Sequence, residues 1–158
     1  MEERNITQFF ERDHDRLDAL FGQFQTGKRS DFPAAKRAFK EFLTGLQRHI
    51  VWEEELLFPA FEQATGMRDV GPTAVMRMEH RQIHQCLEEI HQKVRVQDPN
   101  SDAEEARLLS VLGQHNVKEE QVLYPAIDRM VAPEVRARIL AEVQAGASAP
   151  AHECCSCG

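Results

Sequence analysis

The sequence has 158 residues, 42% of them hydrophobic, and this suits one domain with a buried core. Its 19 basic and 26 acidic side chains give a formal net charge of −7, which argues against a nucleic-acid surface or an anionic membrane as partner. No apolar run approaches the roughly 20 residues of a membrane span, and residues 1–5 lack the apolar core of a secretory signal. Three of the four cysteines crowd into residues 154–157, which is no disulfide framework and favours a cytoplasmic location.

Good helix formers dominate the chain, and apolar residues recur at helical spacing between a few loops that contain glycine or proline. Runs of β-branched residues with period two are absent, so no strand is predicted. We expect helices over residues 7–25, 31–64, 72–95, 101–130 and, as a short fifth helix, 133–145. Because short loops join neighbouring helices antiparallel, the predicted fold class is all-α, an up-down-up-down four-helix bundle. Residues 1–145 form this domain, and residues 146–158 are expected to be a flexible tail.

The chain contains an internal repeat with an offset of 66 residues. Residues 49–60 align with residues 115–126, and seven of these twelve positions are identical. The same offset carries His14 onto His80. The simplest account is two similar helix hairpins related by a pseudo-two-fold axis.

The offset also relates Asp13 to Glu79 and Pro59 to Pro125. A proline inside a helix removes one hydrogen bond and clashes with the preceding turn. We therefore expect a kink or break at each proline.

Histidines are the unusual feature of the composition. Two pairs, His49 with Glu53 and His115 with Glu119, are spaced four apart and so lie on one helix face. Counted from the predicted helix ends, five histidines and two glutamates fall at one depth of the bundle. Each alone would be an ordinary histidine or surface pair, but burying the whole set without a cation would be costly. The candidate metal ligands are His14, His49, Glu53, His80, His84, His115 and Glu119.

The ligand types restrict the metal. Imidazole with carboxylate suits iron, zinc, manganese or copper. Seven ligands exceed the need of one ion and suit two ions bridged by Glu53 and Glu119, with an open coordination position on one of them. Carboxylate-rich di-iron bundles use four glutamates and two histidines. A site richer in neutral imidazole should hold the diferrous state, which favours reversible ligand binding over substrate oxidation, so we expect a binding protein rather than an enzyme.

Over residues 7–130 these motifs resemble the hemerythrin-like, HHE cation-binding domain family. The resemblance implies a four-helix bundle with a non-haem di-iron site, oxo- or hydroxo-bridged, that binds dioxygen. Carried over by position, one iron is bound by His14 and His49, the other by His80, His84 and His115, with Glu53 and Glu119 bridging. The pair of His80 and His84 matches oxygen-binding hemerythrins.

One departure shifts the expected role within the family. Oxygen-binding hemerythrins place an aspartate five residues after the fourth-helix histidine, whereas here Glu119 follows His115 by four. This favours the broader HHE group, whose roles include iron, oxygen and nitric-oxide sensing and the repair of iron centres. We expect a di-iron protein that binds or senses dioxygen or nitric oxide. The alternatives are a peroxide or nitric-oxide redox enzyme, and an iron-storage, iron-donating or repair protein that meets a protein partner through Cys154, Cys155 and Cys157.

Three residues near the ligands have two interpretations each. Glu54 and Glu120 either hydrogen-bond to ligand histidines or are solvated charges. Trp52 either lines the metal pocket or packs in the core.

Three further residues are expected to stay outside the site. Tyr124 aligns with Phe58 and is interpreted as a packing residue. His91 is expected to be an ordinary, partly buried histidine. Cys86 is expected to be a buried apolar thiol.

Overall fold

The structure, a computed structural model, describes residues 5–148, and every regular element among them is helical. The elements are α1 (Ile6–Gly27), α2 (Phe32–Trp52), η1 (Glu53–Leu57), α3 (Phe58–Thr65), α4 (Pro72–Arg95), α5 (Asp102–Lys118), η2 (Glu119–Leu123), α6 (Tyr124–Met130) and α7 (Pro133–Ser148).

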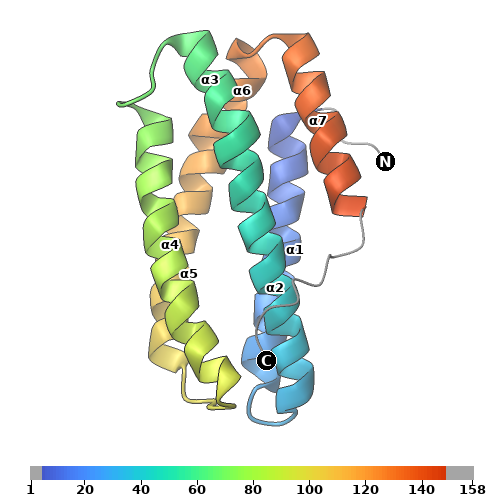
Figure 1. The fold of residues 1–158 in the computed structure, drawn as a ribbon, viewed down its shortest axis with the longest axis vertical. Coiled ribbons are helices and arrows are strands. Elements are labelled where there is room, and N and C mark those ends of the chain that lie inside the picture. The colour runs from blue at the N-terminus through green and yellow to red at the C-terminus, as the bar shows by residue number, and fades with distance from the viewer. Residues whose placement is uncertain (1–4, 149–158) are drawn as a thin grey trace.

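Long, roughly parallel helical rods form the body of the molecule (Figure 1). One rod joins α2, η1 and α3 without interruption, and another joins α5, η2 and α6. α1 packs against α2 and α4 packs against α5, so the chain forms two antiparallel hairpins, while α7 contacts α1. The predicted all-α, up-down-up-down four-helix bundle with a C-terminal helix is confirmed.

Polar side chains cap the two helices of the first hairpin at their N-termini. The Ala34 backbone N–H donates to the Asp31 side chain at the start of α2, and the Gln8 N–H donates to Asn5 at the start of α1. Asp128 of α6 also accepts from the free N–H of Ile6. This bond ties the first turn of α1 to the last rod of the bundle.

The fifth helix is longer than the sequence indicates. It was expected to end before Gly146, but α7 continues to Ser148. A Cβ atom at Gly146 would lie 3.1 Å from Cζ2 of Trp52, so the absence of a side chain lets α7 lie directly against the indole ring. This tertiary contact outweighs the low helix propensity of glycine. The predicted tail thiols of Cys154, Cys155 and Cys157 lie outside the described residues.

In both continuous helices that contain an internal proline, the backbone widens into a π-helical turn just before that proline. The Phe58 N–H donates to the carbonyl of Glu53, and the Tyr124 N–H donates to the carbonyl of Glu119. These bonds span five residues, as in a π-helix. The expected kink or break is therefore a five-residue wide turn. Glu53 and Glu119 are the first residues of η1 and η2, at equivalent positions of the repeat.

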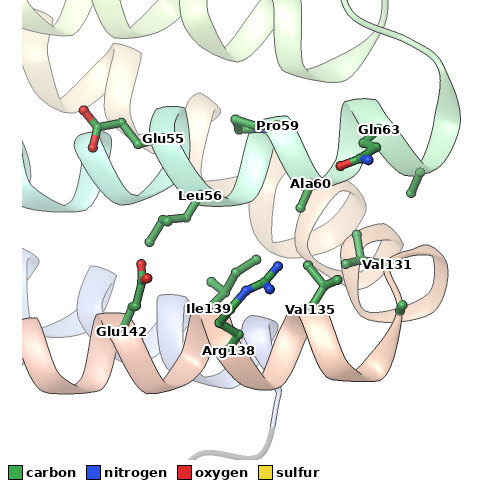
Figure 2. Close-up of a pocket in the computed structure, with 12 residues that line it drawn as sticks. Glu55, Leu56, Pro59, Ala60, Gln63, Val131, Val135, Arg138, Ile139 and Glu142 are labelled. Atoms are coloured by element: carbon green, nitrogen blue, oxygen red, sulfur yellow. The ribbon is translucent and has the colours of Figure 1, made fainter.

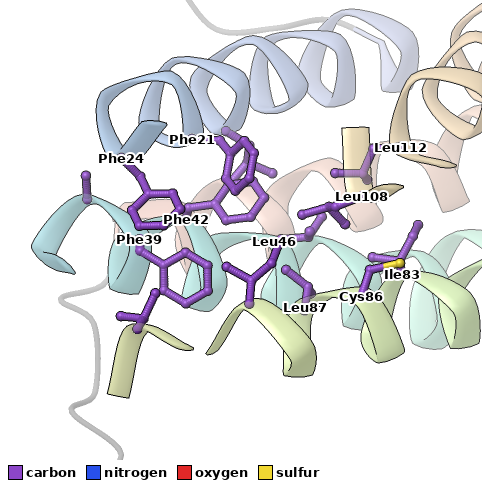
Figure 3. Packing of buried hydrophobic residues seen from close by; sticks show 14 of the residues in the cluster. Phe21, Phe24, Phe39, Phe42, Leu46, Ile83, Cys86, Leu87, Leu108 and Leu112 are labelled. Carbon is purple, nitrogen blue, oxygen red and sulfur yellow. The ribbon is translucent and has the colours of Figure 1, made fainter. Parts of the chain in front are cut away.

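Two apolar clusters fill the bundle, one towards each end. Figure 3 shows part of the first cluster, in which Phe21, Phe42, Leu87 and Leu108 come from four different helices. The second cluster includes Phe10, Trp52, Leu57, Phe58 and Tyr124.

A belt of buried polar residues separates the clusters along the helices. On α1, His14 falls between Phe10 of the second cluster and Leu17 of the first. On α4, His80 falls between Met76 and Ile83 in the same way. The polar belt is therefore placed in the middle of the bundle with apolar side chains above and below.

Candidate metal centre

Six of the seven predicted ligands meet in this belt, and each is at most 4% exposed. Their donor atoms form two groups, within each of which all the atoms lie within 4.8 Å of one another. The first group comes from the side chains of Glu53, His80, His115 and Glu119, and the second from His14, His49 and Glu119. Glu119 belongs to both groups, so the site has the layout of two adjacent cation positions.

Each central carboxylate faces one histidine from its own rod and one from the other hairpin. Oε1 of Glu53 lies 3.5 Å from Nε2 of His49 and 3.3 Å from Nε2 of His80. Oε1 of Glu119 lies 3.3 Å from Nε2 of His115 and 3.4 Å from Nε2 of His14. Both carboxylates therefore lie between histidines of the two hairpins.

Carboxylates on the outer side fix two of these histidines across the hairpins. Nδ1 of His14 lies 2.9 Å from Oε1 of Glu120, and Nδ1 of His80 lies 3.0 Å from Oε1 of Glu54. A proton on Nδ1 leaves the lone pair of Nε2 pointing inward, which is the tautomer that a metal needs. Of the two interpretations of Glu54 and Glu120, contact with the histidines is the one that the structure supports.

The other two histidines have partners that sequence reasoning missed. Nδ1 of His49 lies 2.8 Å from Oδ2 of Asp13, and Nδ1 of His115 lies 3.0 Å from Oε1 of Glu79. The signal was available, because the offset of 66 that relates the two histidines also relates Asp13 to Glu79. All four histidines thus receive the same outer support in a pseudo-two-fold arrangement.

The chemistry of the donor set fits a cation. Both oxygens of Glu119, Oε1 of Glu53 and Nε2 of His80 are buried without a hydrogen-bond partner among the described residues. A buried carboxylate oxygen without a partner is costly, and a metal ion between these atoms would compensate for it.

The surrounding protein atoms shift the pKa values of the two central carboxyl groups in opposite directions. Burial and the adjacent charge of Glu119 raise the pKa of Glu53 well above its usual value. Burial would also raise the pKa of Glu119, but the Glu53 carboxyl and the rings of His115 and His14 outweigh burial and hold that pKa well below its usual value. A proton is therefore held more tightly by Glu53 than by Glu119, and a bound cation would compete with it.

The histidines of the second group are also perturbed. Burial lowers the pKa of His14, but contacts with Glu119 and Glu120 outweigh burial and raise this pKa to about 9. Burial lowers the pKa of His49, and its contact with Asp13 offsets this only in part. A metal at the second group must therefore displace a proton from His14.

The prediction of His84 as a ligand is not supported by the structure. His84 is exposed on α4 and belongs to neither donor group, while the adjacent Ile83 is buried in the core. The depth argument fixed only the level along the helix. Ile83, three residues after His80, is the residue of the next turn that faces the core, and His84 beside it lies on the exposed side of α4.

The two halves of the centre differ at the aromatic position. The Tyr124 hydroxyl donates to Oε2 of Glu53 at 2.9 Å and lies 3.2 Å from Nε2 of His49. The equivalent Phe58 stacks on the ring of His80, with centroids 5.6 Å apart and planes at 16°. The interpretation of Tyr124 as a packing residue was therefore incomplete, because its ring packs while its hydroxyl enters the site.

Other predicted residues lie outside the centre. Trp52 contacts Phe9 and Phe10 in the second apolar cluster, so core packing is the interpretation of Trp52 that the structure supports. His91 is partly buried beside Phe39, and Cys86 is buried, as expected.

A surface groove of about 410 Å³ lies between α3 and α7 and is separate from the centre (Figure 2). Leu56, Pro59, Val135 and Ile139 line it, and none of the six buried ligand candidates does.

No described helix is long and apolar enough to cross a membrane.

Comparison with known families agrees with the geometry of the centre. Residues 5–140 match the model of the hemerythrin HHE cation-binding domain. The chain belongs to the hemerythrin HHE cation-binding family. The resemblance inferred from the histidine and glutamate motifs is thereby confirmed.

Curated relatives carry the name iron-sulfur cluster repair protein YtfE. Those from Escherichia coli O1:K1, Escherichia coli strain K12 / DH10B and Shigella boydii serotype 18 are each 31% identical over 91 residues. The match covers 54% of this chain and 41% of each relative, so the chain spans less than half of their length. No solved structure matches the chain.

Proposed function

We propose that this hemerythrin HHE domain is a non-haem di-iron protein that binds or senses a small ligand such as dioxygen or nitric oxide. The observation that carries the proposal is the pair of buried donor groups that share Glu119. One group supplies two imidazoles and two carboxylates, and the other supplies two imidazoles and a carboxylate.

The donor set favours iron in its lower oxidation state. Imidazole and carboxylate suit iron, and six protein residues for two ions leave coordination positions free. With His84 outside the centre, four neutral imidazoles and two carboxylates remain. This set still has fewer negative charges than the four-glutamate bundles that activate oxygen, so it supports reversible ligand binding.

Anaerobic loading with ferrous iron tests the metal part of the proposal. We expect two iron ions per chain by metal analysis. Cycles of dioxygen and argon should then change the visible absorption reversibly. A stoichiometry of one zinc per chain would refute the di-iron centre, and a one-way conversion to the diferric form would refute reversible binding.

A second candidate function is the repair of iron centres. The names of the YtfE relatives favour it, and so do the thiols of Cys154, Cys155 and Cys157, which suit soft metals and redox exchange. In this function the tail would contact a protein partner.

Truncation before Cys154 separates the two candidates. Iron loading of the truncated chain should be unchanged under both. Transfer of iron to an iron-depleted iron–sulfur protein should fall on truncation if the chain is a repair protein, and transfer that is absent from the full chain would exclude that function.

A further inference from the structure

The two donor groups are unequal, because one has four residues and the other three. The smaller group, His14, His49 and Glu119, lies directly beside the Tyr124 hydroxyl. Tyr124 is fully buried, and its ring packs against Phe10. The hydroxyl is therefore held in place by the core.

Distances around this hydroxyl match those between ligand atoms of one metal ion. Metal–ligand bonds of about 2.1 Å place neighbouring ligand atoms about 3.0 to 3.4 Å apart. Oη of Tyr124 lies 3.2 Å from Nε2 of His49 and 3.4 Å from Nε2 of His14. Nε2 of His14 lies 3.4 Å from Oε1 of Glu119. Four potential donor atoms thus surround the second cation position.

We propose that Tyr124 is a metal ligand, whose Oη is the fourth donor to the cation bound by His14, His49 and Glu119. The assignment rests on the proposed di-iron function. It gives each position two imidazole nitrogens and two oxygens. Glu53 supplies the second oxygen on one side, and Tyr124 supplies it on the other.

Binding replaces the hydrogen bond that Tyr124 now donates to Glu53. The O–H bond breaks, its proton leaves to water, and an oxygen lone pair forms the bond to the cation. A cation lowers the cost of this ionisation, as it does for other metal-bound oxygen and sulfur groups. Freed from the hydroxyl, Oε2 of Glu53 is then available to the metals.

The repeat supplies a matched control at position 58. Phe58 occupies the equivalent place beside His80 and has no hydroxyl. Tyr124→Phe gives both halves the same aromatic residue. The double change Phe58→Tyr with Tyr124→Phe moves the hydroxyl to the other half, and Phe58→Tyr alone places one on each side.

The experiment loads each variant with ferrous iron without air, counts the bound iron, and then admits dioxygen as the oxidant. The wild-type diferric protein should show a visible phenolate-to-iron charge-transfer band, and Raman scattering excited in that band should show tyrosine ring modes. Tyr124→Phe should lose the band and bind its second ferrous ion at least about 10-fold more weakly. The double variant should regain a band.

The outcomes distinguish failure of the Tyr124 assignment from failure of the di-iron proposal. Failure of the wild type to bind two iron ions overturns the di-iron proposal. Two iron ions without a phenolate band, or an unchanged band and affinity in Tyr124→Phe, overturn the assignment of Tyr124 alone. Circular dichroism of the metal-free variants shows whether each has folded.

Discussion

The two halves of the metal centre are nearly the same in construction. The half with His14 and His49 and the half with His80 and His115 each receive outer carboxylates on both Nδ1 atoms. Each central glutamate opens a π-helical turn at the same point of the repeat. The halves differ where one carries the hydroxyl of Tyr124 and the other a phenyl ring. Residues repeated at the offset of 66 thus supply both candidate cation positions. The Tyr124 hydroxyl has no counterpart on Phe58 and makes the two positions unequal.

The largest expected effect comes from removing the shared carboxylate. Glu119→Ala takes a donor from both groups, whereas Glu53→Ala takes one from the first group only. We expect Glu119→Ala to lose most of both iron ions and Glu53→Ala to keep about one, measured by metal analysis after anaerobic loading. Equal iron contents in the two variants would contradict a special position for Glu119.

The next largest effect on iron binding is expected from replacing the carboxylates that contact the Nδ1 atoms of the histidines. The repeat predicts a similar effect in the two halves of the centre. Asp13→Asn and Glu79→Gln should each weaken iron binding by about 10- to 100-fold, because the ring of the ligand histidine loses its orienting partner. Competition with a chelator measures these affinities. Asp15→Asn, an exposed neighbour on α1, is the control and should bind iron as the wild type does. A loss at only one of the two carboxylates would break the equivalence of the halves.

A smaller effect concerns the stability of the metal-free protein. Because the folded-state pKa of Glu53 is raised, its contribution to stability is full below the unfolded pKa near 4.5 and is lost as pH rises through the folded value. Glu53→Gln keeps the neutral form at every pH. Its Tm should therefore exceed that of the wild type by a few degrees above the folded pKa of Glu53, and the difference should vanish towards pH 4. A lower Tm at high pH would contradict the raised pKa.

The smallest effect is expected at His84. Its side chain is exposed on α4, so His84→Ala should leave the iron content and affinity unchanged. Loss of one iron ion would instead place His84 in the centre, as the resemblance to oxygen-binding hemerythrins implied. His80→Ala, one turn away, is the positive control and should lose iron.

Much of the fold could be predicted because short-range signals set the helix limits. α4 spans Pro72–Arg95, as the sequence indicated, and α2 begins directly after Asp31, whose side chain accepts from the Ala34 N–H. The end of α7 could not be predicted, because it depends on a long-range contact between Gly146 and Trp52. The helix geometry before Pro59 and Pro125 could not be predicted either, because a missing N–H can produce a kink, a break or a wide turn.

For the site, rare residue types at one offset were enough to select six residues that the structure brings together in the two donor groups. The estimate of depth along the helices also selected His84, which is exposed and belongs to neither donor group. Depth along a helix does not determine the direction in which a side chain points. Tyr124 was missed for a different reason. An aromatic residue at a core position looks like packing, and only the structure shows where its hydroxyl lies.

The central claim is that two cation positions share Glu119. An anomalous-scattering map of iron-loaded crystals tests it most directly. The account predicts two iron peaks on either side of Glu119, one beside His14 and His49 and the other beside His80 and His115. A single peak, or two peaks with no contact to Glu119, would contradict it.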